Sequence, residues 1–213
     1  MRMLWRSWAL CGLALTLTPC AQAAEPIEGK TVYIDAGHGG EDSGAVGNGL
    51  FEKDINLAVS EHVTDKLKEE GANPVASRSD DHFLTLEERV AKASANQADL
   101  FVSIHVNSGV ASASGTETYF QSDYERENSR RLASDIQSQL VSSLQTRDRG
   151  VKESDFYVIT YSQMPSVLAE LGFITNSSDA DKLGSEEYQQ KAADAIVNGW
   201  SRQNKYNGEN FRV

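Results

Sequence analysis

The chain has 213 residues, of which 20 are lysine or arginine and 31 are aspartate or glutamate, so its formal net charge at pH 7 is −11. Such a length is enough for one domain with a proper hydrophobic core. The acidic balance argues against nucleic acid as a partner, because binding to phosphates needs positive charge. It argues equally against adhesion to an anionic surface by charge alone. The simplest consequence of the acidity is solubility.

The first 23 residues have the order of a secretory signal peptide. MRMLWRS contributes Arg2 and Arg6, the short apolar run WALCGLALTL follows, and Ala21-Gln22-Ala23 supplies the small-x-small pattern that precedes cleavage. The apolar run is shorter than the roughly 20 residues that span a bilayer. We therefore expect cleavage near Ala23 and an exported protein, periplasmic or extracellular, with no membrane anchor.

Both cysteines of the chain, Cys11 and Cys20, lie in this amino-terminal segment. A lipid anchor at Cys20 is the alternative to cleavage after Ala23, but Pro19 directly before the cysteine fits lipoprotein processing poorly. The mature protein would have no thiol, so its stability would not depend on disulfides.

Residues 28–203 are expected to form one domain, and residues 204–213 a polar, flexible tail. Hydrophobic patterns predict strands over Thr31–Asp35, Asn73–Arg78, Asp99–His105, Thr116–Phe120 and Pro165–Glu170. Helices are predicted over Glu52–Glu70, from a capping box at Thr85, over Tyr124–Leu144, and from Ser185 to Trp200. One further strand is expected between the long third helix and Pro165. This alternation predicts a single α/β domain with a mostly parallel, twisted sheet flanked by helices on both faces.

Side chains that can bind a metal ion or transfer a proton lie at or just after the ends of three predicted strands. His38 comes after the first strand, His105 ends the third, and Glu170 ends the last, while Glu52 opens the helix after the glycine-rich loop. Ligands of open α/β sheets usually lie beyond the carboxyl ends of the strands. Two histidines and one carboxylate form a common zinc set that leaves a fourth position for water. The glycines around His38 would let the backbone turn tightly beside a ligand.

Each of these residues also has a simpler explanation when it is taken alone. A histidine at a strand end is more often a satisfied polar residue than a ligand, and Glu52 is well placed to face the dipole of its helix. Glu170 is the one charged residue of VLAELGF, which indicates either a structural partner such as an arginine or a catalytic role. Asp35 is expected either to support a ligand histidine or to cap nearby amides. His62 and His82 are poorer ligand candidates.

Four ordered motifs resemble a known family. They are IDAGHGGEDSGAVGNGLFEKDINL, SRSDD with LEERV, ADLFVSIHVNS, and PSVLAELGFITNSSDADKL. From about Lys30 to Trp200 the chain resembles the zinc-dependent, type-3 N-acetylmuramoyl-L-alanine amidases of bacterial cell walls and phage endolysins. The resemblance implies a zinc amidase domain that hydrolyses the amide between the lactyl group of N-acetylmuramic acid and L-alanine of the stem peptide.

The resemblance also assigns roles to individual residues. It implies that His38, Glu52 and His105 hold one zinc ion per chain, and that Glu170 is the general acid and base. It implies that Asn107, two residues after the second histidine, orients the substrate or the site. Zinc would lower the pKa of its bound water toward about 7. Apolar neighbours would raise the pKa of Glu170, which suits a carboxylate that takes and returns a proton.

The expected partner is peptidoglycan. Some family members carry an extra helical segment over the zinc site, but the stretch between Phe120 and Pro165 leaves little room for one. We therefore expect an open site, no obligatory activator, and a monomer. Two alternatives stay open: a zinc hydrolase of another cell-wall amide, such as a glycan deacetylase, and a non-catalytic wall-binding module.

Overall fold

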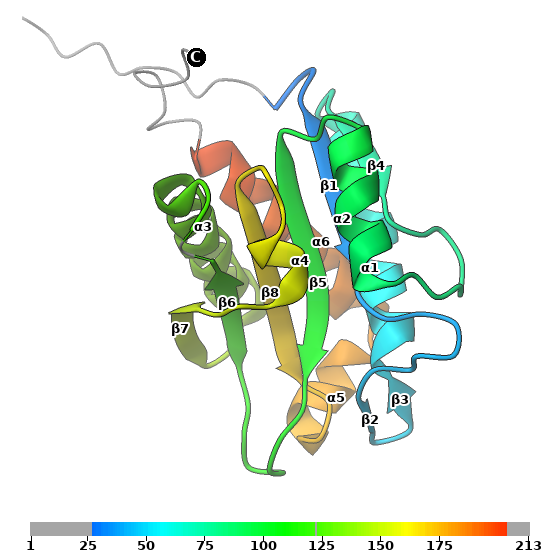
Figure 1. Ribbon diagram of the computed structural model, residues 1–213. Coiled ribbons are helices and arrows are strands. Elements are labelled where there is room, and N and C mark those ends of the chain that lie inside the picture. The colour runs from blue at the N-terminus through cyan, green and yellow to red at the C-terminus, as the bar shows by residue number, and fades with distance from the viewer. Residues whose placement is uncertain (1–26, 122, 204–213) are drawn as a thin grey trace, which may run out of the picture.

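The computed structural model describes residues 27–121 and 123–203, and the predictions for residues 1–23 and 204–213 lie outside these ranges. A six-stranded sheet forms its centre (Figure 1), in the order β4-β1-β5-β8-β6-β7. The strands are β1 (Thr31–Ala36), β4 (Asn73–Ala76), β5 (Leu100–Asn107), β6 (Thr116–Phe120), β7 (Asp148–Glu153) and β8 (Ser166–Phe173). β4, β1, β5 and β8 are parallel, whereas β6 and β7 run in the opposite direction. The mostly parallel sheet is confirmed.

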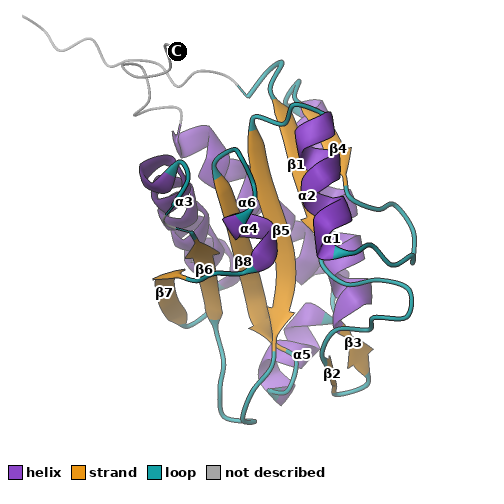
Figure 2. Ribbon diagram, in the orientation of Figure 1, coloured by secondary structure: helices purple, strands orange, loops and turns teal. Residues whose placement is uncertain are grey.

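Helices cover both faces of the sheet, as predicted (Figure 2). One face carries α1 (Glu52–Glu69), α3 (Arg126–Leu144) and α6 (Glu186–Gln203); α1 and α3 pack on the strands, and α6 packs on both of them. The other face carries the shorter α2 (Leu86–Ala95) and α4 (Tyr157–Thr160). Among the described residues, no helix is both long and apolar enough to cross a membrane.

Strand alternation divides the core between these two faces. In β5, Val102 and Ile104 join the larger cluster under α1, α3 and α6, whereas Phe101 joins the smaller cluster with α2 and α4. Because side chains alternate along a strand, Ser103 and His105 lie on the same face as Phe101. The thinner helix layer therefore lies on the face that bears His105.

Local capping signals set several helix ends. The capping box predicted at Thr85 is present, since its side chain accepts from the Glu88 backbone and the Glu88 side chain accepts from the Thr85 backbone. The Ser185 hydroxyl accepts from the backbone N–H of Tyr188 at 3.3 Å at the start of α6. The third helix begins at Arg126 and not at Tyr124, because Glu125 has a left-handed φ of 48°.

The sequence did not predict the shortest elements. These are the two-residue strands β2 (Val46–Gly47) and β3 (Leu50–Phe51), the one-turn helix α4, and α5 (Ser177–Leu183) after β8. Strands of two residues and helices of one or two turns show too few periods for a hydrophobic pattern to be recognised. The β2–β3 hairpin and α5 both lie beyond the carboxyl ends of the parallel strands (Figure 1).

A buried ion pair joins three elements at the carboxyl end of β1. Asp35 accepts from Arg89 of α2 at 2.7 Å and from the hydroxyl of Ser103 of β5 at 2.7 Å. Asp35 and Arg89 are each about 2% exposed or less. Asp35 is therefore neither the support of a ligand histidine nor the amide cap that the sequence suggested. It holds α2 to the sheet.

Replacing Arg89 with alanine would leave the Asp35 carboxylate buried and without its cation. We expect Arg89→Ala to lower the free energy of unfolding by about 3–5 kcal/mol, the usual cost of breaking a buried pair. Urea denaturation measures this change. Lys68→Ala removes an exposed partner of Asp65 and serves as the control, with little expected effect. Equal effects of the two substitutions would contradict the structural role of the buried pair.

Candidate active site

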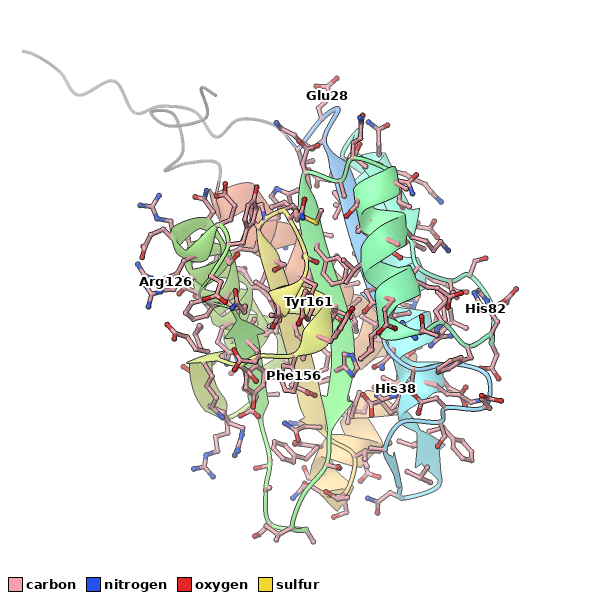
Figure 3. The ribbon with its side chains drawn as sticks, viewed as in Figure 1. Glu28, His38, His82, Arg126, Phe156 and Tyr161 are labelled. Carbon is pink, nitrogen blue, oxygen red and sulfur yellow. The ribbon has the colours of Figure 1, made fainter. Side chains whose placement is uncertain are left out.

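The structure brings His38, Glu52 and His105 together at the carboxyl ends of the parallel strands β1 and β5. His38 follows β1, Glu52 is the first residue of α1, and His105 lies in β5. Glu52 Oε1 lies 2.8 Å from His105 Nδ1 and 3.3 Å from His38 Nε2. The His38 and His105 side chains are 25% and 19% exposed, so solvent and a ligand can reach the cluster. Figure 3 shows His38 toward the lower end of the sheet.

The donor set suits a divalent cation. One potential ligand atom from each of the three residues lies within 4.8 Å of the others, as binding to a single ion requires. Burial raises the pKa of Glu52, but hydrogen bonds from His105 and His38 outweigh it and hold that pKa far below its ordinary range. Burial likewise lowers the pKa of His38, yet Glu52 and Asp42 raise it to about 9. The environment of His38 and Glu52 thus favours added positive charge, which a metal ion supplies.

Two glycines make room for this cluster. A Cβ atom at Gly37 would lie 2.4 Å from His105 Nε2 and Cε1. A Cβ atom at Gly44, whose φ is +62°, would lie 2.6 Å from both Glu52 Oε2 and His38 Cδ2. Neither contact is possible for a real side chain. The glycines of the loop are thus needed for the close approach of the three donors.

The turn that presents His38 is fixed through its backbone carbonyls. The Ala36 carbonyl accepts from both Arg78 and Arg89, at 3.1 and 2.7 Å. The Gly37 carbonyl accepts from Arg78 and Asn56, each at 3.2 Å, and the His38 carbonyl accepts from Arg89 at 2.8 Å. His38 itself has a left-handed φ of 61°. These bonds hold a conformation that a residue other than glycine adopts rarely.

Further contacts orient the three donors. His38 Nδ1 lies 2.7 Å from Asp42 Oδ2, which leaves Nε2 directed toward Glu52. The Glu52 carboxylate accepts from the backbone N–H groups of Ala45 and Val106 at 2.8 and 3.0 Å. Asp42 was not predicted from the sequence. Its four-residue spacing from His38 carries no geometric meaning in a loop.

Glu170 lies beside this cluster, on the strand next to that of His105. In the β5–β8 register it is directly opposite His105, and in the β6–β8 register it is opposite Glu117. Directly opposite side chains share a face of the sheet. The buried Oε2 atom of Glu170 has no hydrogen bond within the described residues, and burial raises the pKa of the carboxyl to about 7. Within residues 27–121 and 123–203, Glu170 thus has no arginine partner, which was the structural alternative that the sequence left open.

Asn107 lies next to the site but is bonded within the protein. Its Nδ2 donates to Glu117 Oε1 at 2.7 Å, and its Oδ1 accepts from the Ser108 backbone at 2.8 Å. Substrate binding by Asn107 stays a prediction. Glu117, which the sequence analysis did not single out, is the buried centre of this neighbouring network.

The remaining histidines do not join the cluster. His82 contacts Asp80 on a loop at the edge of the molecule (Figure 3). His62 lies in the middle of α1. In the described part of the chain, only His38, Glu52 and His105 form a group of metal-ligand type.

Comparison with known proteins identifies relatives along nearly the whole chain. The family Amidase_3, described as N-acetylmuramoyl-L-alanine amidase, matches residues 32–202. The uncharacterized protein YqiI of Bacillus subtilis strain 168 is 98% identical over 199 residues, which cover 93% of this chain and 97% of YqiI. The N-acetylmuramoyl-L-alanine amidase LytC of the same strain is 55% identical over 179 residues, which cover 84% of this chain but 36% of LytC. The chain therefore spans only about a third of LytC.

Solved structures give the same result. An N-acetylmuramoyl-L-alanine amidase from Clostridium difficile 630 has a TM-score of 0.81 at 36% identity, covering 85% of this chain and 100% of that one. The catalytic domain of the amidase CwlV from Bacillus (Paenibacillus) polymyxa var. colistinus has a TM-score of 0.77 at 40% identity, covering 81% and 97% of the two chains. By its sequence, its fold and its grouped histidine and glutamate donors, the chain belongs to the Amidase_3 family of N-acetylmuramoyl-L-alanine amidases.

Proposed function

We propose that this amidase hydrolyses peptidoglycan by a zinc-dependent reaction in which Glu170 carries the proton. The bond cleaved joins the lactyl group of N-acetylmuramic acid to L-alanine. The observation that carries the proposal is the position of an unpartnered carboxylate, Glu170, directly opposite His105 and beside the grouped donors.

His38, Glu52 and His105 would hold the metal ion. Two imidazole nitrogens and one carboxylate oxygen are a common set for catalytic zinc, which keeps a position open for water or substrate. When bound, zinc supplies a Lewis acid for the scissile carbonyl and lowers the pKa of bound water. Asp42 fixes the ring of His38, and two backbone N–H groups fix Glu52, so the donors are oriented before the ion binds.

Glu170 would act first as a base and then as an acid. It would accept a proton from the attacking water and deliver it to the departing nitrogen of L-alanine. A single carboxylate can perform both steps when its pKa lies near the working pH, and burial raises the pKa of Glu170 to about 7. The absence of a competing hydrogen bond at Oε2 leaves the group free for this transfer.

We further propose that the mature protein is exported, works as a monomer, and needs no activator. The amino-terminal segment has the composition of a signal peptide. The third helix, α3, packs against α6 and the sheet, on the face opposite to His105. The partial exposure of His38 and His105 also supports a site open in the resting protein.

The reaction is tested by digesting purified peptidoglycan with the purified mature protein alone. We expect new L-alanine amino termini, which disappear with a chelator and return on addition of zinc. Light scattering of the purified protein, without peptidoglycan, should give the mass of one chain. Release of acetate would instead identify a glycan deacetylase. Zinc binding without any product would indicate a binding module or a required activator.

Removing the carboxylate of Glu170 should separate chemistry from binding. Glu170→Gln is expected to lower kcat by about 10²- to 10⁴-fold, the usual contribution of a general acid–base group. Zinc content, measured by metal analysis, should stay at the wild-type level. Glu61→Gln, on the exposed side of α1, is the matched control and should retain full activity. Unchanged turnover in Glu170→Gln would show that another group moves the proton.

Export is tested by expressing the full chain in a bacterial host and measuring the intact mass of the protein outside the cytoplasm. The expected product begins at Ala24, because cleavage follows Ala21-Gln22-Ala23. A lipid-modified product beginning at Cys20 would support the anchored alternative. Full-length protein confined to the cytoplasm would contradict export.

A further inference from the structure

A second polar network lies on the catalytic face, next to Glu170. Its centre is Glu117 of β6, which is 2% exposed. Glu117 Oε1 accepts from Asn107 and from the Tyr119 hydroxyl, at 2.7 and 2.8 Å. Glu117 Oε2 accepts from Arg149 Nε at 2.7 Å and from Lys152 Nζ. The proposed reaction uses none of these groups.

The network carries more positive than negative charge. Burial raises the pKa of Glu117, but bonds from Lys152, Tyr119 and Arg149 outweigh it and lower that pKa below its ordinary range. Glu117 is therefore ionised and neutralises one of its two cations. An excess positive charge remains beside the active site of a chain whose net charge is −11. Neutralising one buried carboxylate would require only one of the two cations.

Arg149 is held by two contacts that leave its terminal guanidinium nitrogens available as hydrogen-bond donors. Its Nε bonds to Glu117, and its guanidinium carbon lies 4.6 Å from the centre of the Phe173 ring. Its two terminal nitrogens donate no hydrogen bond to the described part of the chain, and its side chain is 25% exposed. A guanidinium group held in this way can bind a carboxylate, because its planar N–H donors can form two parallel hydrogen bonds to the two carboxylate oxygens.

Arg149 lies on the side of the active site toward which the released stem peptide would extend. His105, Glu170 and Glu117 are directly opposite one another across β5, β8 and β6, and Arg149 and Lys152 reach Glu117 from β7. Glu170 must approach the departing nitrogen, so the released peptide begins next to β8. Neighbouring strands are about 4.8 Å apart, and one residue of extended peptide advances about 3.5 Å. The second residue of the peptide would thus reach the guanidinium over β6.

We propose that Arg149, with Lys152 beside it, binds a free carboxylate on the second residue of the stem peptide, the one that follows L-alanine. The proposal rests on the proposed amidase reaction at Glu170. It gives the enzyme a preference for stems that carry this group as the free acid over stems that carry it as the carboxamide. Glu117, Tyr119 and Phe173 act as positioning residues that hold the two cations at the edge of the site.

A purely structural role predicts a different result. If Arg149 only balanced the charge of Glu117, its removal would disturb the surroundings of Glu170 and slow the cleavage of every substrate alike. If Arg149 binds the substrate, its removal affects mainly the substrate with the free carboxylate. The ratio of kcat/KM for the two substrates therefore separates the roles.

The test uses two N-acetylmuramoyl peptides that differ only in the residue after L-alanine, which carries a free carboxylate in one and a carboxamide in the other. We expect the wild-type enzyme to prefer the free acid by about tenfold or more, as for a hydrogen-bonded ion pair. Arg149→Gln should remove this preference by lowering kcat/KM for the free acid alone. Arg149→Lys, which keeps the charge but not the planar donors, should restore part of it.

Controls make each outcome decisive. Arg147→Gln removes the same charge two residues away, at an exposed position, and should keep the wild-type preference. Zinc content and the melting temperature verify that the variants are folded and loaded. Equal kcat/KM of the wild type for both peptides, or an equal loss for both in Arg149→Gln, would overturn the subsite. No cleavage of either peptide by the wild type, when peptidoglycan is also left intact, would instead overturn the proposed amidase reaction.

Discussion

The site depends on how the chain leaves β1. The three carbonyl groups of residues 36–38 point at the guanidinium groups of Arg78 and Arg89, and Asn56 adds a further donor. These bonds hold His38 at a φ of 61°, a conformation that by itself is unfavourable for histidine. Arg78 has no carboxylate partner among its hydrogen bonds and is satisfied by backbone oxygens alone. The cations thus act on the peptide backbone, and through it on the direction of one imidazole ring.

Four acidic side chains lie near the ends of these strands, and their different surroundings give the same chemical group different properties. Asp35 is neutralised by Arg89, Glu52 is surrounded by two imidazoles and two N–H groups, and Glu117 receives four donors. Glu170 alone is buried without a partner at Oε2. Burial without compensation disfavours the charged form, and it raises the pKa of this carboxyl to about 7. The cations and hydrogen-bond donors around the other three carboxylates stabilise their ionised form, and would therefore make them poor proton carriers.

The features that could be predicted from the sequence are those marked by a regular residue pattern or a local motif. Alternation in β5 identified its two faces, the spacing of the Thr85 capping box identified the start of α2, and the histidine and glutamate motifs named residues that the structure places together. Asp42, Glu117 and Arg149 escaped prediction for a physical reason. Their positions depend on a loop conformation and on the register of β6 with β7 and β8, which includes an irregularity after Thr116. The true partner of Asp35 was likewise set by the docking of α2, which no local pattern specifies.

The unequal faces of the sheet explain how one domain combines these features. An unpartnered carboxylate and a left-handed histidine each reduce stability, so the rest of the domain must offset their cost. The larger cluster under α1, α3 and α6 contains most of the buried apolar residues and lies on the face opposite to that of His105. The opposite face, on which the shorter helices α2 and α4 pack, bears His105, whose side chain is 19% exposed. Because strands alternate, β5 and β8 contribute to the core through every second side chain and to chemistry through the others. A residue such as Ala169 therefore packs in the core, while its neighbour Glu170 lies opposite His105 on the other face, where the proposed proton transfer takes place.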